Sequence, residues 1–496
     1  MPNAPVRRIA TALAALLAIV VAVVMLERPR AGLAIETRAI GTTPATLYRM
    51  PDGTGPVVVV AHGFAGSRQI MQAYTLSLAQ AGYRVLAFDF EGHGRNPVPM
   101  SGDVTAVEGT TALLVAETRR VIAAARTLPG SPPVALLGHS MATDILVRAG
   151  IAEEAAGRPV AALVAVSMFS QAVTATEPER LLIVSGEWEG FLRSAALDAV
   201  HLVDPGAREG ETGVRGAVTR RAVVAPGVEH VGVLYSATAV RAARDWLDAA
   251  FGRGSTAPIA RPGPWILLLL TGIVVAFRPV AALLPAGPAA PVLSLRRFLA
   301  VAIVPAVAVP FLIVPVYDNF LPVLVADYLM LHLAGLGLIQ IALTGGVRRP
   351  SGAFPGMAVL ALAFWGIAVF GVALDRHAAS FVPTIERLPV IAALAIGTVP
   401  FMIADARATE GGGAALWRRI LLRAMLIVSL GIAAALDPQE LTFVVIILPV
   451  LVLFFLVHGV LGRRVARRSG PLAAGIGLGL CLAYALGVSF PLFRPA

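Results

Sequence analysis

Residues 134–142 read VALLGHSMA. An apolar run of strand length ends at Gly138, Ser140 follows two residues later, and a helical pattern continues from Ala142. The stretch therefore predicts a strand, a sharp turn and a helix. A serine on such a turn has backbone amides converging near its hydroxyl group, as acyl transfer requires for a developing oxyanion. Ser140 is the predicted nucleophile, and the amide of Met141 is a predicted oxyanion donor.

The composition indicates that much of the chain faces lipid. The 496 residues are 57% hydrophobic and 14% charged, whereas a soluble protein carries about 25% charged residues. One cysteine, Cys481, excludes disulfides and cysteine-based metal sites. The net charge of +10 does not indicate nucleic-acid binding, because residues 35–254 hold 19 Arg against 21 Asp plus Glu. The positive excess lies in the apolar part of the chain.

The N-terminal apolar run is long enough to cross a bilayer. It extends from Ile9 to Leu26 behind Arg7 and Arg8. The alternative is a cleaved signal peptide, which would end in a small-residue cleavage site, but residues 27–30 read ERPR. We therefore expect an uncleaved anchor. The predicted organisation is an anchor at 1–34, an α/β domain at 35–252, a Gly/Pro-rich linker at 253–263 and a membrane domain of about eight helices at 264–496.

Arginine positions test this membrane topology, because cytoplasmic loops carry an excess of basic residues. The eight expected helices cover about 264–282, 298–316, 321–343, 355–374, 388–404, 417–436, 441–461 and 472–490. With the anchor as a ninth span, 15 arginines fall on one side and six on the other. The pattern places the N-terminus in the cytoplasm and the α/β domain outside it. It predicts a multi-pass protein of a bacterial inner membrane with that domain on the periplasmic side.

The segment between anchor and linker alternates strand and helix patterns. Strands are expected at Thr46–Arg49, Pro56–Ala61, Arg84–Phe88, Val134–Leu137, Ala161–Val166, Leu181–Ser185 and Ala222–Ala225, and the clearest helices at Val107–Thr127 and Thr238–Phe251. This alternation predicts a parallel, doubly wound sheet with helices on both faces. In such folds the functional groups collect at the carboxyl ends of the strands.

Two glycine-rich loops follow expected strands. Residues 61–67 read AHGFAGS, and the amide of Phe64 is a candidate second oxyanion donor beside that of Met141. The alternative is an ordinary strand-to-helix turn. Residues 89–96 read DFEGHGRN, where Asp89 and His93 have catalytic residue types but a structural loop is the preferred interpretation.

These three motifs, in this order and spacing, resemble the α/β-hydrolase fold superfamily near its lysophospholipase and serine-aminopeptidase-like branch. The resemblance covers roughly residues 35–252. Ala142 departs from the usual glycine of the turn, and Asn96 stands where the branch often has serine. The resemblance implies a nucleophile, an acid and a histidine in that order. It places the acid at Glu189, with Glu187 as the alternative, and the histidine at His230 in the sequence PGVEH.

The resemblance further implies the role of each group. His230 would take the proton from Ser140 while the carboxylate fixes its tautomer. No cofactor and no metal is implied. Only about 14 residues separate two expected strands where many lipases insert a helical cap, so we expect a hydrolase fold without a large cap. An uncapped pocket near the bilayer would admit an acyl chain from lipid.

The resulting hypothesis is a membrane-integrated serine hydrolase that cleaves a lipid or acyl ester. Its partners would be the bilayer and this substrate, without nucleic acid, and the oligomeric state is open. Two alternatives remain: an acyltransferase that uses the same acyl-enzyme, and a transporter or scaffold with an inactive hydrolase domain. Within the spans, four polar residues are candidates for a role in function because ionisable groups are costly there: Asp327, His332, Gln340 and Asp405.

Overall fold

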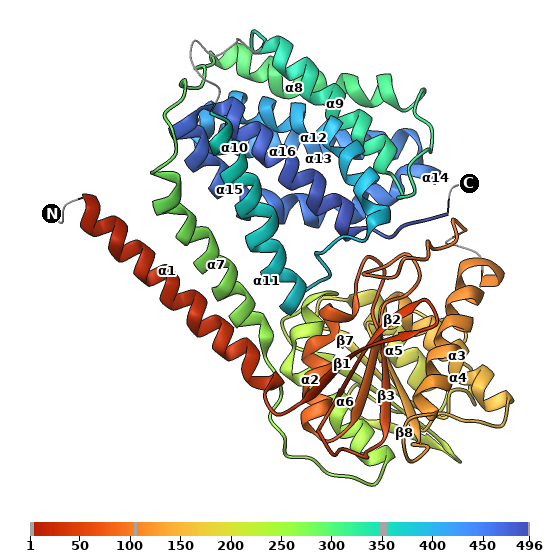
Figure 1. The fold of residues 1–496 in the computed structure, drawn as a ribbon. Coiled ribbons are helices and arrows are strands. Elements are labelled where there is room, and N and C mark those ends of the chain that lie inside the picture. The colour runs from red at the N-terminus through yellow and green to blue at the C-terminus, as the bar shows by residue number, and fades with distance from the viewer. Residues whose placement is uncertain (1–3, 104–106, 347–354, 495–496) are drawn as a thin grey trace. The chain divides into compact units, whose positions relative to one another are not determined.

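The computed structural model describes residues 4–103, 107–346 and 355–494, and its contacts divide the chain into two units (Figure 1). The sheet unit comprises Ala22–Leu267 together with Asp375–Ser380. The helical unit comprises Met1–Val21, Leu268–Leu374 and Phe381–Ala496. Each unit has its own core, so each is described by itself.

The described part of the sheet unit contains a nine-stranded sheet in the order β1-β2-β4-β3-β5-β6-β7-β9-β8. Neighbours from β4 to β9 are parallel, and the pairs β1–β2, β2–β4 and β8–β9 are antiparallel. The strands are β1 (Ala34–Ile40), β2 (Thr43–Arg49), β3 (Val57–Ala61), β4 (Arg84–Phe88), β5 (Val134–His139), β6 (Leu163–Val166), β7 (Arg180–Gly186), β8 (Thr212–Arg215) and β9 (Val218–Ala225).

Helices cover both faces of this sheet (Figure 1). The figure shows α3 and α4 on one face, and α2 and α6 on the other. Their bounds are α2 (Gln72–Gln80), α3 (Ala112–Arg126), α4 (Met141–Ala155), α5 (Gly190–His201) and α6 (Ala237–Ala250). The central strands consist almost entirely of buried aliphatic residues, as two covered faces require. The predicted α/β class is confirmed.

All seven expected strands are present, and the structure adds β1 and β8. Both additional strands lie at the edges of the sheet; β1 is half-buried to exposed, and β8 is exposed apart from Gly213. Residues 167–179 connect β6 to β7 without a helix, so no helical cap is inserted there. The carboxyl ends of β5, β6 and β7 are therefore left uncovered by this connection.

The helical unit is made of long apolar helices. Nine helices of the described chain are long and apolar enough to cross a membrane, in agreement with the predicted number. They are α1 (Ala4–Glu27), α7 (Pro262–Ala281), α8 (Leu295–Ile313), α9 (Ala326–Leu343), α10 and α11 as one span (Gly356–His377), α12 (Leu388–Ala408), α13 (Leu416–Leu436), α14 and α15 as one span (Pro438–Ser469) and α16 (Pro471–Ser489). The chain is a membrane-embedded protein.

Small residues allow the central helices of this unit to pack closely. A Cβ atom at Gly337 of α9 would lie 2.4 Å from the amide nitrogen of Phe401 in α12. A Cβ atom at Gly479 of α16 would lie 2.5 Å from Cα of Val399, also in α12. Close backbone approach through small residues is a main source of helix association in lipid. Helix α12 is thus held between α9 and α16.

The polar residues inside these helices have partners in the helical unit. The His332 ring lies 2.7 Å from the Tyr328 hydroxyl and 3.0 Å from the Ser429 hydroxyl. Asp405 forms an ion pair with Arg423 at 3.1 Å. The amide of Gln340 donates to a carbonyl of α8, and Asp327 accepts from the amide of Leu321. These contacts explain how the groups are accommodated, and we assign them no role in transport.

Residues 375–380, which comprise the last turn of α11 and the three residues after it, pack within the sheet unit. Arg376 makes a two-pronged ion pair with Glu27, at 2.6 and 2.7 Å. Asp375 pairs with Arg95 at 2.5 Å, and the amide of Ser380 donates to the hydroxyl of Ser67 at 2.9 Å. Hydrophobicity did not predict this association, because it depends on specific polar contacts.

Candidate active site

Ser140 occupies a strained turn between β5 and α4. Its φ of 54° and ψ of −122° are unusual for a residue with a side chain. Such strain persists where the surroundings hold it, and it is concentrated at functional sites. A Cβ atom at Gly138 would lie 2.6 Å from Leu146 and 3.0 Å from Ala142. Gly138, two residues before the serine, therefore leaves the space that the side chains of Leu146 and Ala142 occupy.

The structure brings Ser140, His230 and Glu189 together. The Ser140 hydroxyl oxygen lies 2.8 Å from Nε2 of His230, and Nδ1 of the same ring lies 2.6 Å from Oε1 of Glu189. His230 is part-exposed, with 43% of its side chain accessible, whereas only 5% of the Glu189 side chain is accessible. The histidine is thus reachable from solvent while its carboxylate partner is held inside.

Three donors hold the Glu189 carboxylate. Besides His230, it accepts hydrogen bonds from the amide of Gly186 at 2.6 Å and from the hydroxyl of Ser167 at 2.8 Å. Burial alone raises the pKa of Glu189, but the hydrogen bonds from His230, Gly186 and Ser167 outweigh it and leave the pKa below its usual value. The group is therefore an anion at neutral pH, able to orient a histidine and stabilise its protonated form.

The carboxylate of Glu187, the alternative acid, is not paired with His230 in the described structure. Its side chain is exposed, and its carboxylate accepts from the amide of Gly227 at 2.7 Å. The geometry thus associates His230 with Glu189 and associates Glu187 with the turn that precedes the histidine.

The loop after β3 comes close to the serine. A Cβ atom at Gly63 would lie 2.9 Å from Nδ1 of His139 and 3.0 Å from Cβ of Ser140. Among the described residues, neither the Phe64 amide nor the Met141 amide donates a hydrogen bond. Met141 is the first residue of α4, where an amide has no partner within the helix. Two free donors beside the nucleophile fit the expected oxyanion hole.

Two further histidines stabilise the backbone around the site. Nε2 of His139 lies 2.8 Å from the carbonyl oxygen of His230, and because a carbonyl only accepts, this nitrogen carries the hydrogen. Burial lowers the pKa of His139 to about 4, so the ring is neutral. His62 donates from Nδ1 to the carbonyl of Gly63 and accepts at Nε2 from the amide of Phe90. Neither contacts the nucleophile through a hydrogen bond.

Asp89 and His93 lie in a structural loop, as the sequence indicated. Asp89 is fully buried and accepts from Arg68 through both its backbone amide and its guanidinium group. The amide of Arg95 donates to the same carboxylate at 3.0 Å. These contacts tie the loop after β4 to the segment that follows the Phe64 loop.

Ser167 and an exposed aromatic rim were not identified from the sequence. Ser167 directly follows β6, has a φ of 53° and is completely buried. The available signal in the sequence was a polar residue directly after an aliphatic strand. Phe169, Trp188 and Phe191 follow β6 and β7 and are 54%, 69% and 71% exposed. Large exposed apolar side chains grouped together mark surfaces that bind apolar partners.

Comparison with known proteins supports the hydrolase fold. Residues 54–188 match the model of the family described as serine aminopeptidase, S33. An epoxide hydrolase of Caballeronia sordidicola is 32% identical over 76 residues, which are 15% of this chain and 23% of that protein. The chain therefore spans about a quarter of the length of this curated relative.

Solved structures that match part of this chain include TT1662 from Thermus thermophilus and dienelactone hydrolase from Anabaena variabilis. TT1662 is 18% identical, with 45% of this chain and 99% of that chain covered and a TM-score of 0.33. The dienelactone hydrolase is 16% identical, with 44% and 96% covered and a TM-score of 0.32. The chain carries an α/β-hydrolase fold together with a series of long apolar helices.

Proposed function

We propose that this protein is a serine hydrolase that cleaves an acyl ester of a lipid-like substrate. The observation that carries the proposal is the continuous hydrogen-bonded series from Ser140 through His230 to Glu189, at 2.8 and 2.6 Å. A nucleophile within reach of a base that a third group orients is the arrangement of covalent acyl transfer.

The reaction follows from this arrangement. The Ser140 oxygen forms a bond to the ester carbonyl carbon while Nε2 of His230 takes its proton. The carbonyl oxygen becomes an oxyanion and is held by the amides of Phe64 and Met141. The ester bond then breaks and His230 returns the proton to the departing alkoxide. Water, deprotonated by the same histidine, releases the acyl group and restores Ser140.

The apolar rim favours a substrate with an acyl chain. Phe169 and Phe191 lie with their ring centroids 6.2 Å apart, and Val231 beside the histidine is 47% exposed. These residues follow the carboxyl ends of β6, β7 and β9, the edge of the sheet to which the triad residues also belong. Covering them with an alkyl chain would stabilise binding by about 0.8 kcal/mol per buried methylene. The ester class is thus inferred from the rim and the reaction from the triad.

The arginine distribution supports a location for the reaction. Fifteen arginines on one side against six on the other favour an N-terminus in the cytoplasm of a bacterium. Residues 35–252 would then work on the periplasmic side of the inner membrane. The predicted domain boundaries are retained in this proposal.

A fluorophosphonate probe tests the proposal, because it reacts with an activated serine. Purified full-length protein is expected to be labelled, and Ser140→Ala is expected to lose the label. Unlabelled protein from the same preparation is assayed on p-nitrophenyl esters of increasing chain length, with an epoxide as comparison because one relative is an epoxide hydrolase. Folded wild type without label would reject the proposal, and label without net ester hydrolysis would indicate acyl transfer to another acceptor.

A further inference from the structure

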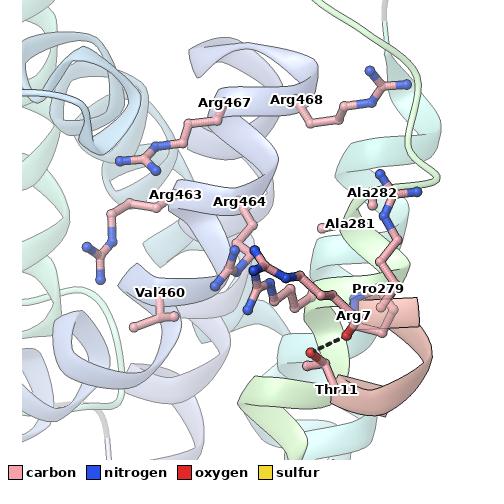
Figure 2. A pocket seen from close by; sticks show the side chains of 12 residues that line it. Arg7, Thr11, Pro279, Ala281, Ala282, Val460, Arg463, Arg464, Arg467 and Arg468 are labelled. Carbon is pink, nitrogen blue, oxygen red and sulfur yellow. Dashed lines mark hydrogen bonds between the residues drawn. The ribbon is translucent and has the colours of Figure 1, made fainter. Parts of the chain in front are cut away.

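An arginine-lined hollow of about 560 Å³ lies within the helical unit (Figure 2). It is formed by the amino-terminal end of α1 and the carboxyl-terminal ends of α7 and α15. Among the residues that the structure describes, seven arginines line it: Arg7, Arg8, Arg278, Arg463, Arg464, Arg467 and Arg468. The other lining residues are Thr11, Pro279, Ala281, Ala282 and Val460. The surface of this hollow is therefore cationic and aliphatic.

The lining offers no counter-charge. None of its residues is acidic, and in the described part of the chain no carboxylate oxygen lies within 4 Å of these seven guanidinium groups. Elsewhere in the same unit, Arg418 and Arg423 do pair with carboxylates. Seven like charges around one space repel one another and attract an anion.

Some of these guanidinium groups already donate hydrogen bonds within the described part of the protein, and others do not. Arg463, Arg467 and Arg468 each donate to a backbone carbonyl, that of Gly459, Gly412 and Leu284 respectively. For the side chains of Arg7, Arg8, Arg278 and Arg464, the described residues provide no hydrogen-bond acceptor. Figure 2 shows Arg7 and Arg464 extending from different helices toward the same space. Four guanidinium groups are thus available to a ligand.

The general preference for arginine on the cytoplasmic side explains why this end of the helices is positive. It does not explain why arginines from distant parts of the chain line one hollow. That preference concerns loops and helix ends separately. Here residues separated by more than 450 positions in the chain, from Arg7 to Arg468, line one hollow. Convergence of several donors on one volume is a property of a binding site.

We propose that this hollow binds the phosphate group of an anionic ligand. The planar guanidinium fork matches two phosphate oxygens at once, which is why arginine is favoured in phosphate sites. Basic pockets between membrane helices suit the headgroups of anionic phospholipids. The aliphatic residues Pro279, Ala281 and Val460 would contact the glycerol and first acyl carbons of such a lipid. A soluble phosphate compound shares the same anionic group.

The test uses the full-length protein in nanodiscs and compares two sources of phosphate. One arm contains phosphatidylcholine with or without phosphatidylglycerol, and the other adds inorganic pyrophosphate to phosphatidylcholine discs. The variant is Arg278→Gln combined with Arg464→Gln, and single Arg464→Gln serves if the double variant fails to fold. Arg296→Gln is the matched control, because this exposed arginine of α8 lies outside the hollow. Elution volume and circular dichroism report folding.

The readouts are lipid retained in native mass spectrometry and the melting temperature. Wild type and Arg296→Gln are expected to retain phosphatidylglycerol and melt higher with it. The double variant is expected to bind about 30-fold more weakly, from about 1 kcal/mol for each arginine near an anionic membrane. Stabilisation by pyrophosphate with the same dependence on both arginines would support a soluble ligand. Equal responses of the double variant and the control, or no response of wild type to either source, would overturn the proposal.

Discussion

Glu187 and Glu189 are separated by one residue, but the turn after β7 directs their side chains to different partners. Glu189 is directed inward to Ser167 and His230, while Glu187 remains at the surface beside Gly227. Sequence spacing alone left both residues as candidates, because the difference depends on the direction of each side chain. The position of a carboxylate relative to a histidine ring is a tertiary property.

Replacing Glu189 with glutamine tests its orienting role. The amide keeps the shape but neither enforces the tautomer nor stabilises the protonated ring of His230. We expect kcat for p-nitrophenyl ester hydrolysis to fall by roughly 10³–10⁴-fold, the size of the effect known for the acid of such triads. Glu187→Gln is the matched control and should retain nearly full activity. A similar loss in both variants would contradict the assignment.

The buried carboxyl group of Glu117 should make the stability of the fold depend on pH, independently of catalysis. It is completely buried on α3, and burial raises its pKa to about 7, although Thr43 and the amide of Glu91 donate to it. A carboxyl group whose pKa is raised on folding stabilises the fold below its unfolded pKa of about 4.3. This contribution is lost as the pH rises through about 7.

The measurement is the melting temperature between pH 5 and pH 8. The contribution of Glu117 should decline by on the order of 3 kcal/mol across this range. The Glu117→Gln variant cannot titrate, so the difference in melting temperature between wild type and this variant should change with pH. Glu187→Gln, which removes an exposed carboxylate, should follow the wild-type slope. Parallel curves for wild type and Glu117→Gln would show that Glu117 is ionised throughout.

At the scale of elements, the Phe64 loop and the serine turn together supply both amides of the proposed oxyanion hole. The loop packs so closely that Gly63 has room for a hydrogen atom only. Gly63→Ala would place a methyl group 2.9 Å from His139 and push the loop away from Ser140. Loss of one oxyanion donor typically lowers kcat by about 10²–10³-fold.

The Gly63→Ala variant should show this loss in kcat, and because Gly63 is buried, its melting temperature is measured alongside to separate lost catalysis from lost folding. Gly254→Ala is the control, since a methyl group there meets no atom within 4 Å. Activity of Gly63→Ala equal to that of Gly254→Ala would mean that the Phe64 amide does not hold the oxyanion.

The elements that sequence patterns predicted are those with a strong local signal. The strands Val57–Ala61 and Val134–His139 are unbroken buried aliphatic runs, so their hydrophobicity identified them. Strands β1 and β8 were missed because exposed edge strands such as TGVR carry no apolar run. The association of residues 375–380 with the sheet unit was missed for another reason. It depends on pairs such as Arg376 with Glu27, which lie 349 positions apart.

At the scale of the molecule, the number of spans was predictable and the packing of the spans was not. The nine long apolar helices of the described residues agree with the nine predicted segments, because length and hydropathy are local properties. Which helices occupy the centre depends on where small residues meet, as Gly337 and Gly479 do against α12. The arginine-lined hollow likewise follows from helix packing, since its residues come from three separate helices.

The proposed orientation predicts which loops a reagent outside the cell membrane can reach. Single-cysteine variants are made in a Cys481→Ser background, because Cys481 is the one natural cysteine. Thr256→Cys lies before the second span and should be on the periplasmic side, whereas Ala289→Cys follows that span and should face the cytoplasm. Both positions are exposed.

In intact cells a membrane-impermeant maleimide should label Thr256→Cys, while Ala289→Cys should react only after the cells are opened. The physical reason is that the arginine-rich loops stay on the cytoplasmic side, and Arg278, Arg296 and Arg297 flank the loop that contains Ala289. The reversed labelling pattern would place the triad in the cytoplasm. Its ester substrate would then come from the inner leaflet, and the arginine-lined hollow would face the periplasm.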